Sequence, residues 1–222
     1  GTITSVDATS TGTKTTVDTL ALNLKGVTVA AGNNVIVDAD VKTLNVNSST
    51  TASTLGILTA AGATTVNVSG DAKLTITGAT TLTAVKDIVV TNTAGFDLGA
   101  TTLAAGTTFT GGAGNDTIIL AGAQTKAITM GAGNDKVTYA GALGTGGSVA
   151  AGEGNDTIVM TVANALLADD NSTFNTTFTG FETLELNTSA AGTINLTGIN
   201  GVSTVVMATG VGHVIVLDNL VS

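Results

Sequence analysis

Residues 111–119 read GGAGNDTII, residues 131–138 read GAGNDKVT, and residues 152–159 read GEGNDTIV. Each stretch has the form Gly-x-Gly-Asn-Asp followed by a short run of residues that favour β-strands. The final aspartates of successive copies are 19 and then 21 residues apart. A Gly-rich turn that recurs at this period, with one Asp before an apolar position, indicates a β-solenoid in which each repeat forms one coil.

The motif predicts how each coil turns and continues. Two glycines around one residue allow backbone conformations with positive φ, so the turn is tight and its carbonyl oxygens can point towards a common centre. Residues 117–120 are β-branched and apolar, as a half-buried strand requires. Between motifs we expect plain turns at 121–125 and 141–147 and return strands at 126–130 and 148–151. This layout places all three Asp turns on the same side of the stack.

Stacking of these turns predicts a column of negative charge. Successive coils lie about 4.8 Å apart, so Asp116, Asp135 and Asp156 would lie one above another. Two such charges repel by about 3 kcal/mol at an effective dielectric constant of about 20. A hard divalent cation between two turns would convert this repulsion into binding, and a cage of two carboxylates and four backbone carbonyls suits calcium better than zinc or magnesium. The three turns therefore predict two inter-turn calcium sites.

The motif residues resemble a known family. Residues 111–159 are similar to the RTX (repeats-in-toxin) nonapeptide, Gly-Gly-x-Gly-x-Asp-x-apolar-x. The wider context, from Gly99 through residues 179–184 (TGFETL), resembles the RTX-containing surface-layer proteins of Gram-negative bacteria. The resemblance implies a calcium-binding β-roll, type I secretion, and assembly into a two-dimensional coat (S-layer) on the cell.

The predicted metal site combines the aspartates with the turn residues around them. Its residues are Gly111, Gly112, Ala113, Gly114, Asp116, Gly131, Ala132, Gly133, Asp135, Gly152, Glu153, Gly154 and Asp156. Met130 and Ala151 replace the leading glycine in the second and third copies, so their carbonyls would substitute for those of glycine. The alternate turns carry no acid, so only one side of the roll is expected to hold metal. Asp97 and Asp71 lie in weakened copies of the motif and are two further candidate ligands.

Composition narrows the classes of partner. The chain of 222 residues has 16 acidic and 7 basic residues, every basic residue is Lys, and the net charge is −9. This balance argues against nucleic acid, which requires a positive surface, and suits a chain that binds cations. There is no Cys, which is consistent with a secreted bacterial protein, and no apolar run approaches the length of a membrane span. The chain begins at Gly1 without Met, and we expect a fragment of a longer secreted protein.

Residues 1–109 are rich in Thr, Ala, Val and Asn and predict many short strands punctuated by glycine, with no helix between them. A sandwich is possible, but a parallel β-solenoid continuous with the roll explains the small residues and the absence of Pro more economically. The expected strands are residues 19–24, 34–39, 43–47, 64–69, 73–77 and 87–91.

We expect three regions: an irregular parallel β-solenoid over 1–109, the RTX roll over 110–162, and a changed pattern over 163–222. Residues 163–170 predict one short helix that caps the roll, followed by a polar loop over 171–177. Strands then resume at 182–187, 193–197, 203–208 and 213–218. The fold class is therefore all-β, with one short capping helix.

The sequence argues against catalysis. His213 is the only histidine and alone cannot build a zinc site or a Ser-His-Asp relay. Glu182 and Glu185 fall on opposite faces of one strand by parity, which is a poor arrangement for a glycosidase pair. The glycine-rich turns lack the lysine of a phosphate-binding loop. We expect no enzymatic activity from this chain.

The expected function is structural. We interpret the chain as part of a secreted, calcium-ordered bacterial surface layer whose main partner is a second copy of itself, in lateral lattice contacts. Cell-surface lipopolysaccharide or glycan would be bound through parts outside this chain, and neither nucleic-acid binding nor membrane spanning is expected. The alternatives are the repeat domain of a secreted RTX adhesin or toxin and, third, a β-helix enzyme that acts on polysaccharide.

Overall fold

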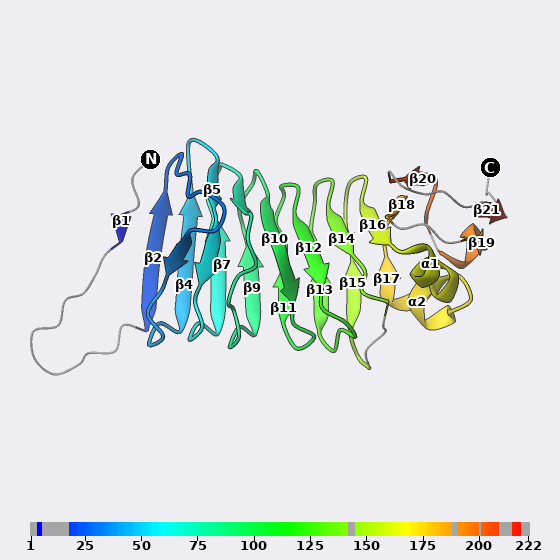
Figure 1. The fold of residues 1–222 in the computed structure, drawn as a ribbon, viewed down its shortest axis with the longest axis horizontal. Coiled ribbons are helices and arrows are strands. Elements are labelled where there is room, and N and C mark those ends of the chain that lie inside the picture. The colour runs from blue at the N-terminus through cyan, green and yellow to red at the C-terminus, as the bar shows by residue number, and fades with distance from the viewer. Residues whose placement is uncertain are drawn as a thin grey trace, which may run out of the picture.

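The protein is an elongated stack of β-coils in the computed structural model (Figure 1). The structure describes residues 4–5, 18–141, 145–187, 191–199, 201–208 and 215–218. Within them the chain winds through a parallel β-solenoid of about 8 turns with little helix. The predicted solenoid is thus confirmed, and the alternative sandwich is not, because the coils pair in parallel rather than as antiparallel hairpins.

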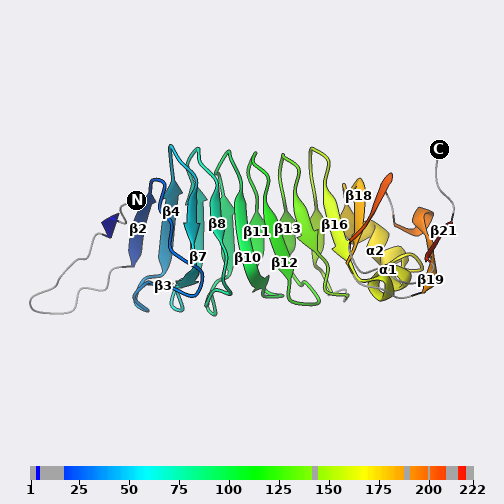
Figure 2. The same cartoon turned by 45° about the horizontal axis from the view of Figure 1, so that its top comes forward.

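Two long sheets form the walls of the solenoid, and a view turned by 45° shows their strands following one another along the same axis (Figure 2). The first sheet has the order β1 (Thr4–Ser5), β2 (Thr19–Leu24), β4 (Thr43–Ser48), β7 (Thr65–Ser69), β9 (Asp87–Val90), β11 (Thr108–Thr110), β13 (Ala127–Thr129), β15 (Ser148–Ala150) and β17 (Phe178–Thr179). All its neighbouring strands are parallel except β1, which pairs antiparallel with β2. Most of the predicted strands in this sheet are confirmed to within one residue at each end.

The second sheet faces the first across the core and carries the candidate site at one of its corners. Its order along the stack is β5 (Ser53–Leu55), β8 (Leu74–Ile76), β10 (Phe96–Leu103), β12 (Thr117–Leu120), β14 (Lys136–Thr138), β16 (Thr157–Met160), β18 (Thr183–Leu186) and β20 (Thr204–Met207). Strand β12 spans the predicted residues. Both sheets continue without a break past residue 110, where the sequence predicts the start of the roll: β11 pairs with β13 in the first sheet, and β10 pairs with β12 in the second.

Inward-facing side chains form apolar rows that run along the stack. In β4, Leu44 and Val46 are buried, and Asn45 between them faces outward. Leu44 pairs in register with Val66, and Val66 pairs with Ile88. The matching row of the second sheet contains Ile118, Val137, Ile158, Leu184 and Val205. The alternation of apolar with Thr or Asn residues therefore determines which face of each strand enters the core.

The N-terminal coils have a third side that the sequence analysis did not anticipate. Strands β3 (Asn34–Ile36) and β6 (Ile57–Thr59) pair in parallel, and Thr59 forms a further bridge to Thr81. The first of these coils are longer than those of the roll: residues one coil apart are separated by 24 positions between β2 and β4 and by 22 between β4 and β7, against 19 and 21 in the roll. The extra residues supply the third side. The predicted strand at 34–39 ends early, at Ile36.

The C-terminal region departs from the expected single helix. Helix α1 (Val162–Ala168) is capped at its N-terminus by Thr161, whose hydroxyl accepts the N–H of Asn164 at 3.0 Å. The predicted polar loop that follows is wrong: its residues form a second helix, α2 (Ser172–Thr177), because Asn171 caps its first turn and Phe174 is buried. Both helices lengthen the coil between β16 and β17 (Figure 1).

Aromatic side chains hold α2 against the solenoid. The Phe174 ring lies 4.7 Å from Phe178 of β17 and 5.4 Å from Tyr139, measured between centroids. Helix α1 contacts β16 and β19 (Gly192–Asn195), which pairs with β21 (Ile215–Asp218) and is followed by the short 3-10 helix η1 (Leu196–Gly198). Parts of the predicted regions 1–109 and 163–222, including His213, and residues 142–144 of one predicted turn lie outside the described residues. No helix among the described residues is long and apolar enough to cross a membrane.

Candidate metal centre

The three Gly-x-Gly-Asn-Asp motifs stack on one corner of the solenoid, immediately before β12, β14 and β16. The first residues of these strands pair in register, so the aspartates that precede them occupy equivalent positions in successive coils. Asp116, Asp135 and Asp156 are at most 1% exposed. The structure therefore brings the three sequence-predicted acids together in a buried column.

Backbone amides tie each acid to the preceding coil. Asp135 Oδ1 accepts the N–H of Asp116, and Asp156 Oδ1 accepts the N–H of Asp135, both at 2.7 Å. Asp116 Oδ1 accepts the N–H of Phe96 at 2.7 Å, and Glu182 Oε2 accepts the N–H of Asp156 at 2.8 Å. The carboxylates thus form a continuous ladder of charge-assisted hydrogen bonds from Phe96 to Glu182.

The asparagines of the motif form a second ladder that runs in the opposite direction. Asn115 Oδ1 accepts the N–H of Asn134 at 2.8 Å, and Asn134 Oδ1 accepts the N–H of Asn155 at 3.0 Å. Asn155 Oδ1 then accepts the hydroxyl of Thr183 at 3.1 Å. Each Asn therefore binds the following coil while the Asp beside it binds the preceding one. This pairing gives the Asn-Asp dipeptide a structural role in stacking.

The glycines of the motif are required by close approach between coils. Gly152 has a φ of 110° and Gly154 a φ of 140°, a region that side chains rarely adopt. A Cβ at Gly152 would collide with the carbonyl oxygen of Gly131, and one at Gly154 with the carbonyl oxygen of Gly133. The turns of neighbouring coils therefore pack backbone against backbone, which confirms the tight turns expected from the sequence.

Burial changes the acidity of the column. Burial raises the pKa of Asp116 to about 6 from its ordinary value of 3.8, although the amides of Phe96 and Gly112 lower it. Burial raises the pKa of Asp135 to about 7, and the charges of Asp116 and Asp156 raise it further against the effect of the Asp116 amide. Burial also raises the pKa of Asp156, with a contribution from the charge of Glu182. The charge of Lys73 also lowers the pKa of Asp116, but burial outweighs it, so the charged form of these carboxylates is disfavoured in the column.

Two carboxylate oxygens in the column have no hydrogen-bond partner. Both Asp135 Oδ2 and Asp156 Oδ2 are buried and unpartnered, whereas Asp116 Oδ2 accepts the N–H of Gly112 at 3.3 Å. Buried polar atoms are nearly always paired, so these two oxygens indicate a missing partner. Both are hard oxygen donors, the kind that calcium prefers. The residues present therefore fit a calcium ion at this corner.

Backbone oxygens would have to complete such a site. Within the described residues, no group of three or more His, Cys, Asp or Glu side chains is arranged to hold a metal. Several carbonyls of the predicted site hold the turns together: those of Gly112, Gly131 and Glu153 accept the N–H groups of Ala132, Glu153 and Gly133 at 2.8, 2.9 and 2.8 Å. A cation would bind the remaining turn carbonyls or replace some of these bonds.

The two further candidate ligands, Asp97 and Asp71, lie elsewhere. Asp97 pairs in register with Thr117, so Phe96 rather than Asp97 lies below Asp116. The Asp97 side chain instead accepts the N–H of Gly99 at 2.8 Å. Asp71 is exposed and accepts the N–H of Thr50, which has an uncommon positive φ of 68°. The structure does not bring either carboxylate to the column.

Glu182 joins the column, although sequence reasoning did not include it among the ligands. Strands β16 and β18 pair Thr157 with Thr183, which places Glu182 over Asp156. A local signal was present in the sequence. Two of the aspartates and Glu182 are each followed by Thr and then a branched apolar residue, the start of a strand of the second sheet.

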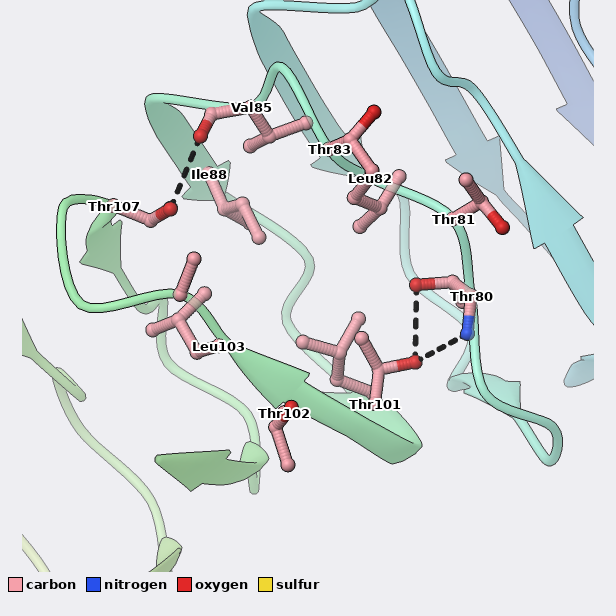
Figure 3. A pocket seen from close by; sticks show the side chains of 12 residues that line it. Thr80, Thr81, Leu82, Thr83, Val85, Ile88, Thr101, Thr102, Leu103 and Thr107 are labelled. Atoms are coloured by element: carbon pink, nitrogen blue, oxygen red, sulfur yellow. Dashed lines mark hydrogen bonds between the residues drawn. The ribbon is translucent and has the colours of Figure 1, made fainter. Parts of the chain in front are cut away.

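Figure 3 shows a separate pocket of about 300 Å³. Thr81, one of its lining residues, forms the bridge to Thr59 at the end of the third side of the solenoid. Threonine hydroxyls and aliphatic side chains line the pocket. Figure 3 shows the hydrogen bond between Thr80 and Thr101, in which the Thr101 Oγ1 accepts the Thr80 N–H at 2.7 Å. Thr107 donates its hydroxyl to the carbonyl of Val85 at 3.0 Å. None of the lining residues is titratable, so the pocket offers no side chain for acid–base catalysis.

Comparison with models of known protein families finds no match, and comparison with curated protein sequences finds none either.

Proposed function

We propose that this chain is a calcium-ordered structural solenoid of a secreted bacterial surface-layer protein, without enzymatic activity of its own. The observation that carries the proposal is the column of buried acids with partnerless oxygens on Asp135 and Asp156. Burial of an unpaired carboxylate lowers the folding stability by roughly several kcal/mol unless a cation or a proton neutralises the charge. A calcium ion between turns would provide both the charge and the missing partner.

The donor set favours calcium over other metals. The column offers carboxylate and backbone carbonyl oxygens, whereas zinc, copper and nickel prefer sites with imidazole or thiolate ligands. Calcium also accepts flexible cages of six to eight oxygens, which suits turns whose carbonyls are not held rigidly in an octahedron. The residues proposed to hold the ions are Asp116, Asp135, Asp156 and the glycines of the three turns.

The structural role rests on the form of the fold and on the motif resemblance. A solenoid in which each coil contacts its neighbours presents long, regular faces suited to repeated lateral contacts with other copies. Calcium would also screen the net charge of −9 that otherwise opposes association. Type I secretion and attachment to surface lipopolysaccharide or glycan through parts outside this chain belong to the same proposal.

Electron microscopy and metal analysis test the proposal together. We expect concentrated protein to bind calcium and to form ordered sheets in negative stain at millimolar calcium, but not after exchange into EGTA. The Asp135→Asn variant, which keeps the hydrogen-bond acceptor and removes the charge, is the control for a specific effect of the site.

Different outcomes separate the alternatives. Protein that binds calcium yet stays monomeric and binds a glycan or host ligand would be the repeat domain of an RTX adhesin or toxin. Turnover of a polysaccharide would point to a β-helix enzyme. Purified protein that binds no calcium at millimolar concentrations would overturn the proposal.

A further inference from the structure

The acid column extends one coil beyond the last Gly-x-Gly-Asn-Asp motif. Glu182 occupies the position that Asp156 occupies one coil earlier, and its Oε2 accepts the Asp156 N–H at 2.8 Å. The same hydrogen bond joins Asp156 to Asp135 and Asp135 to Asp116. Glu182 thus makes the contact of a motif aspartate without belonging to a motif.

The shape of the turn explains why a glutamate takes this place. Residues 150 and 179 pair in register, and so do residues 157 and 183, so the chain reaches the column with fewer residues in the later coil. Gly180 makes the bend with a φ of 80°, and the side chain of Phe181 is buried. A glutamate has one methylene more than an aspartate, which lets its carboxylate reach the column from a shorter corner.

The partnerless oxygens lie towards this end of the column. Asp116, at the N-terminal end, has both carboxylate oxygens bonded to backbone N–H groups. Asp135 and Asp156 each have a buried Oδ2 without a partner. Asp156 lies between Asp135 and Glu182, and the charge of Glu182 is close enough to act on it. A buried carboxylate oxygen without a partner is therefore present on the neighbour of Glu182 in the column, as well as between the motif turns.

We propose that Glu182 and Asp156 form an additional calcium site at the C-terminal end of the column, beyond the two inter-turn sites expected from the motifs. This inference rests on the proposed calcium function and deepens it. The site would use one oxygen of each carboxylate together with oxygens of the 152–155 turn. Glu182 is only partly buried, whereas the motif aspartates are fully buried, so water would complete this shell. This end site is therefore weaker and exchanges faster than the inner sites.

Substitution of Glu182 by glutamine separates metal binding from stacking. Glu182→Gln keeps an oxygen that can accept the Asp156 N–H, and it removes the charge. Glu185→Gln is the matched control, since it removes a charge from the same β-segment. Glu185 faces outward, where its Oε2 lies 2.7 Å from Lys136 Nζ. Calcium bound per chain is measured by equilibrium dialysis with atomic emission, and unfolding is followed in EGTA.

We expect Glu182→Gln to bind one calcium ion fewer than the unsubstituted protein, or to bind its weakest ion at least tenfold more weakly. Glu185→Gln should bind calcium as the unsubstituted protein does. In EGTA, Glu182→Gln should melt no lower than the unsubstituted protein, while Glu182→Ala, which removes the acceptor, should melt lower.

The outcomes distinguish this inference from the proposed function. If Glu182→Gln binds as many ions as tightly as the unsubstituted protein, Glu182 only accepts a hydrogen bond, and the inference fails while the calcium function stands. If the unsubstituted protein binds no calcium at all, the proposed function fails first.

Discussion

One position in the coil is filled in two different ways along the same solenoid. In the N-terminal coils it holds Ser53, then Leu74 and then Phe96, which pair in register and are each 1% exposed. In the following coils it holds Asp116 and its successors, which are equally buried. The position stays buried across this boundary, and the side chain changes from that of Phe96 to that of Asp116. The pairing of β10 with β12 is irregular only beyond this position, between Asp97 and Thr102.

The comparison shows that stacking does not require the acids. An apolar side chain at this position contributes about 1.5–3 kcal/mol when buried, as Leu74 and Phe96 do. An ionised carboxylate in the same place costs free energy unless it is neutralised, and only part of its hydrogen-bonding capacity is used. The acids are therefore best explained by a ligand that the apolar coils do not need.

Calcium removal should have the largest effect, and it should affect only one half of the molecule. Without metal, the stacked acids and a net charge of −9 oppose compaction, and each turn residue costs about 1–2 kcal/mol of backbone entropy to fix. We expect EGTA to lower β content by circular dichroism and to reverse association in light scattering. Hydrogen exchange should accelerate over 111–159 and stay slow over 43–90.

Magnesium added back in place of calcium is the control for ionic strength, and it should not restore protection. Unchanged β content, association and exchange after verified calcium removal would mean that strand packing alone holds the roll, as it holds the apolar coils.

Asp135→Asn should abolish most of the calcium-dependent stability. Asp135 lies between two other acids and has a buried, partnerless oxygen, whereas Asp116 is at the end of the column and has both oxygens bonded. Each lost site removes about 2.7 kcal/mol when calcium is 100 times its dissociation constant. Denaturant unfolding with and without calcium should show a larger loss for Asp135→Asn than for Asp116→Asn. Equal losses would be incompatible with the stacking order.

Gly152→Ala should destabilise the protein by at least about 2 kcal/mol, because it combines a positive φ of 110° with a collision against Gly131. Gly122→Ala is the matched control, since a Cβ there meets nothing within 4 Å. It should be neutral or stabilising by up to about 1 kcal/mol. The free energy of unfolding of both variants is measured in EGTA, so that a difference in bound metal does not contribute to the values. Similar values for the two variants would show that the turns can move apart.

Acidification should stabilise the metal-free protein, in contrast to an ordinary protein whose carboxylates are paired. The folded pKa values of about 7 for Asp135 and about 6 for Asp116 exceed the ordinary 3.8. A group with a raised folded pKa contributes stability that is fully present below its unfolded pKa and is lost as pH rises through its folded pKa. In EGTA, the melting temperature should therefore rise as pH falls from about 8 towards about 5.

The calcium-loaded protein should respond in the opposite direction, because protons compete with calcium for the same oxygens. Asp135→Asn should flatten the metal-free profile. A metal-free melting temperature that falls on acidification over this range would show that the acids are not buried in the uncharged form.

The sequence predicted the parts of the fold that repeat, and it missed those that do not. The motif spacing was sufficient to place the Asp column, because a parallel stack of coils leaves little freedom in register. The third side at β3 and β6 was missed because short alternating runs predict strands without showing how many sides a coil has. Helix α2 was missed because Asn171 and its polar neighbours indicate a loop unless the burial of Phe174 is known.

The site was predictable to the same extent. Register placed Asp116, Asp135 and Asp156 together, but the one-residue offset of Asp97 depends on pairing that spacing alone does not reveal. Glu182 was not predicted as a site residue because its turn lacks the glycine pattern of the motifs. The Thr and Leu that follow it nevertheless resemble the first two residues of the strands that follow the motifs. The hydrogen-bond ladders that join Asn to one coil and Asp to the other required atomic positions.

Asn134→Ala should have the smallest effect and should separate stacking from metal binding. Asn134 Oδ1 accepts the N–H of Asn155 from the next coil, at an exposed position where water can replace the lost acceptor. We expect a loss of about 0.5–1.5 kcal/mol in denaturant unfolding, the usual net contribution of one hydrogen bond. Calcium bound per chain should not change, because the Asn ladder and the Asp column extend from adjacent residues in opposite directions along the stack. Asp135→Asn should show the reverse: less calcium bound, and a stability in EGTA at neutral pH that is no lower than that of the unsubstituted protein. If Asn134→Ala also released calcium, the two ladders would act as one unit. The asparagine of the motif would then contribute to metal binding rather than to stacking alone.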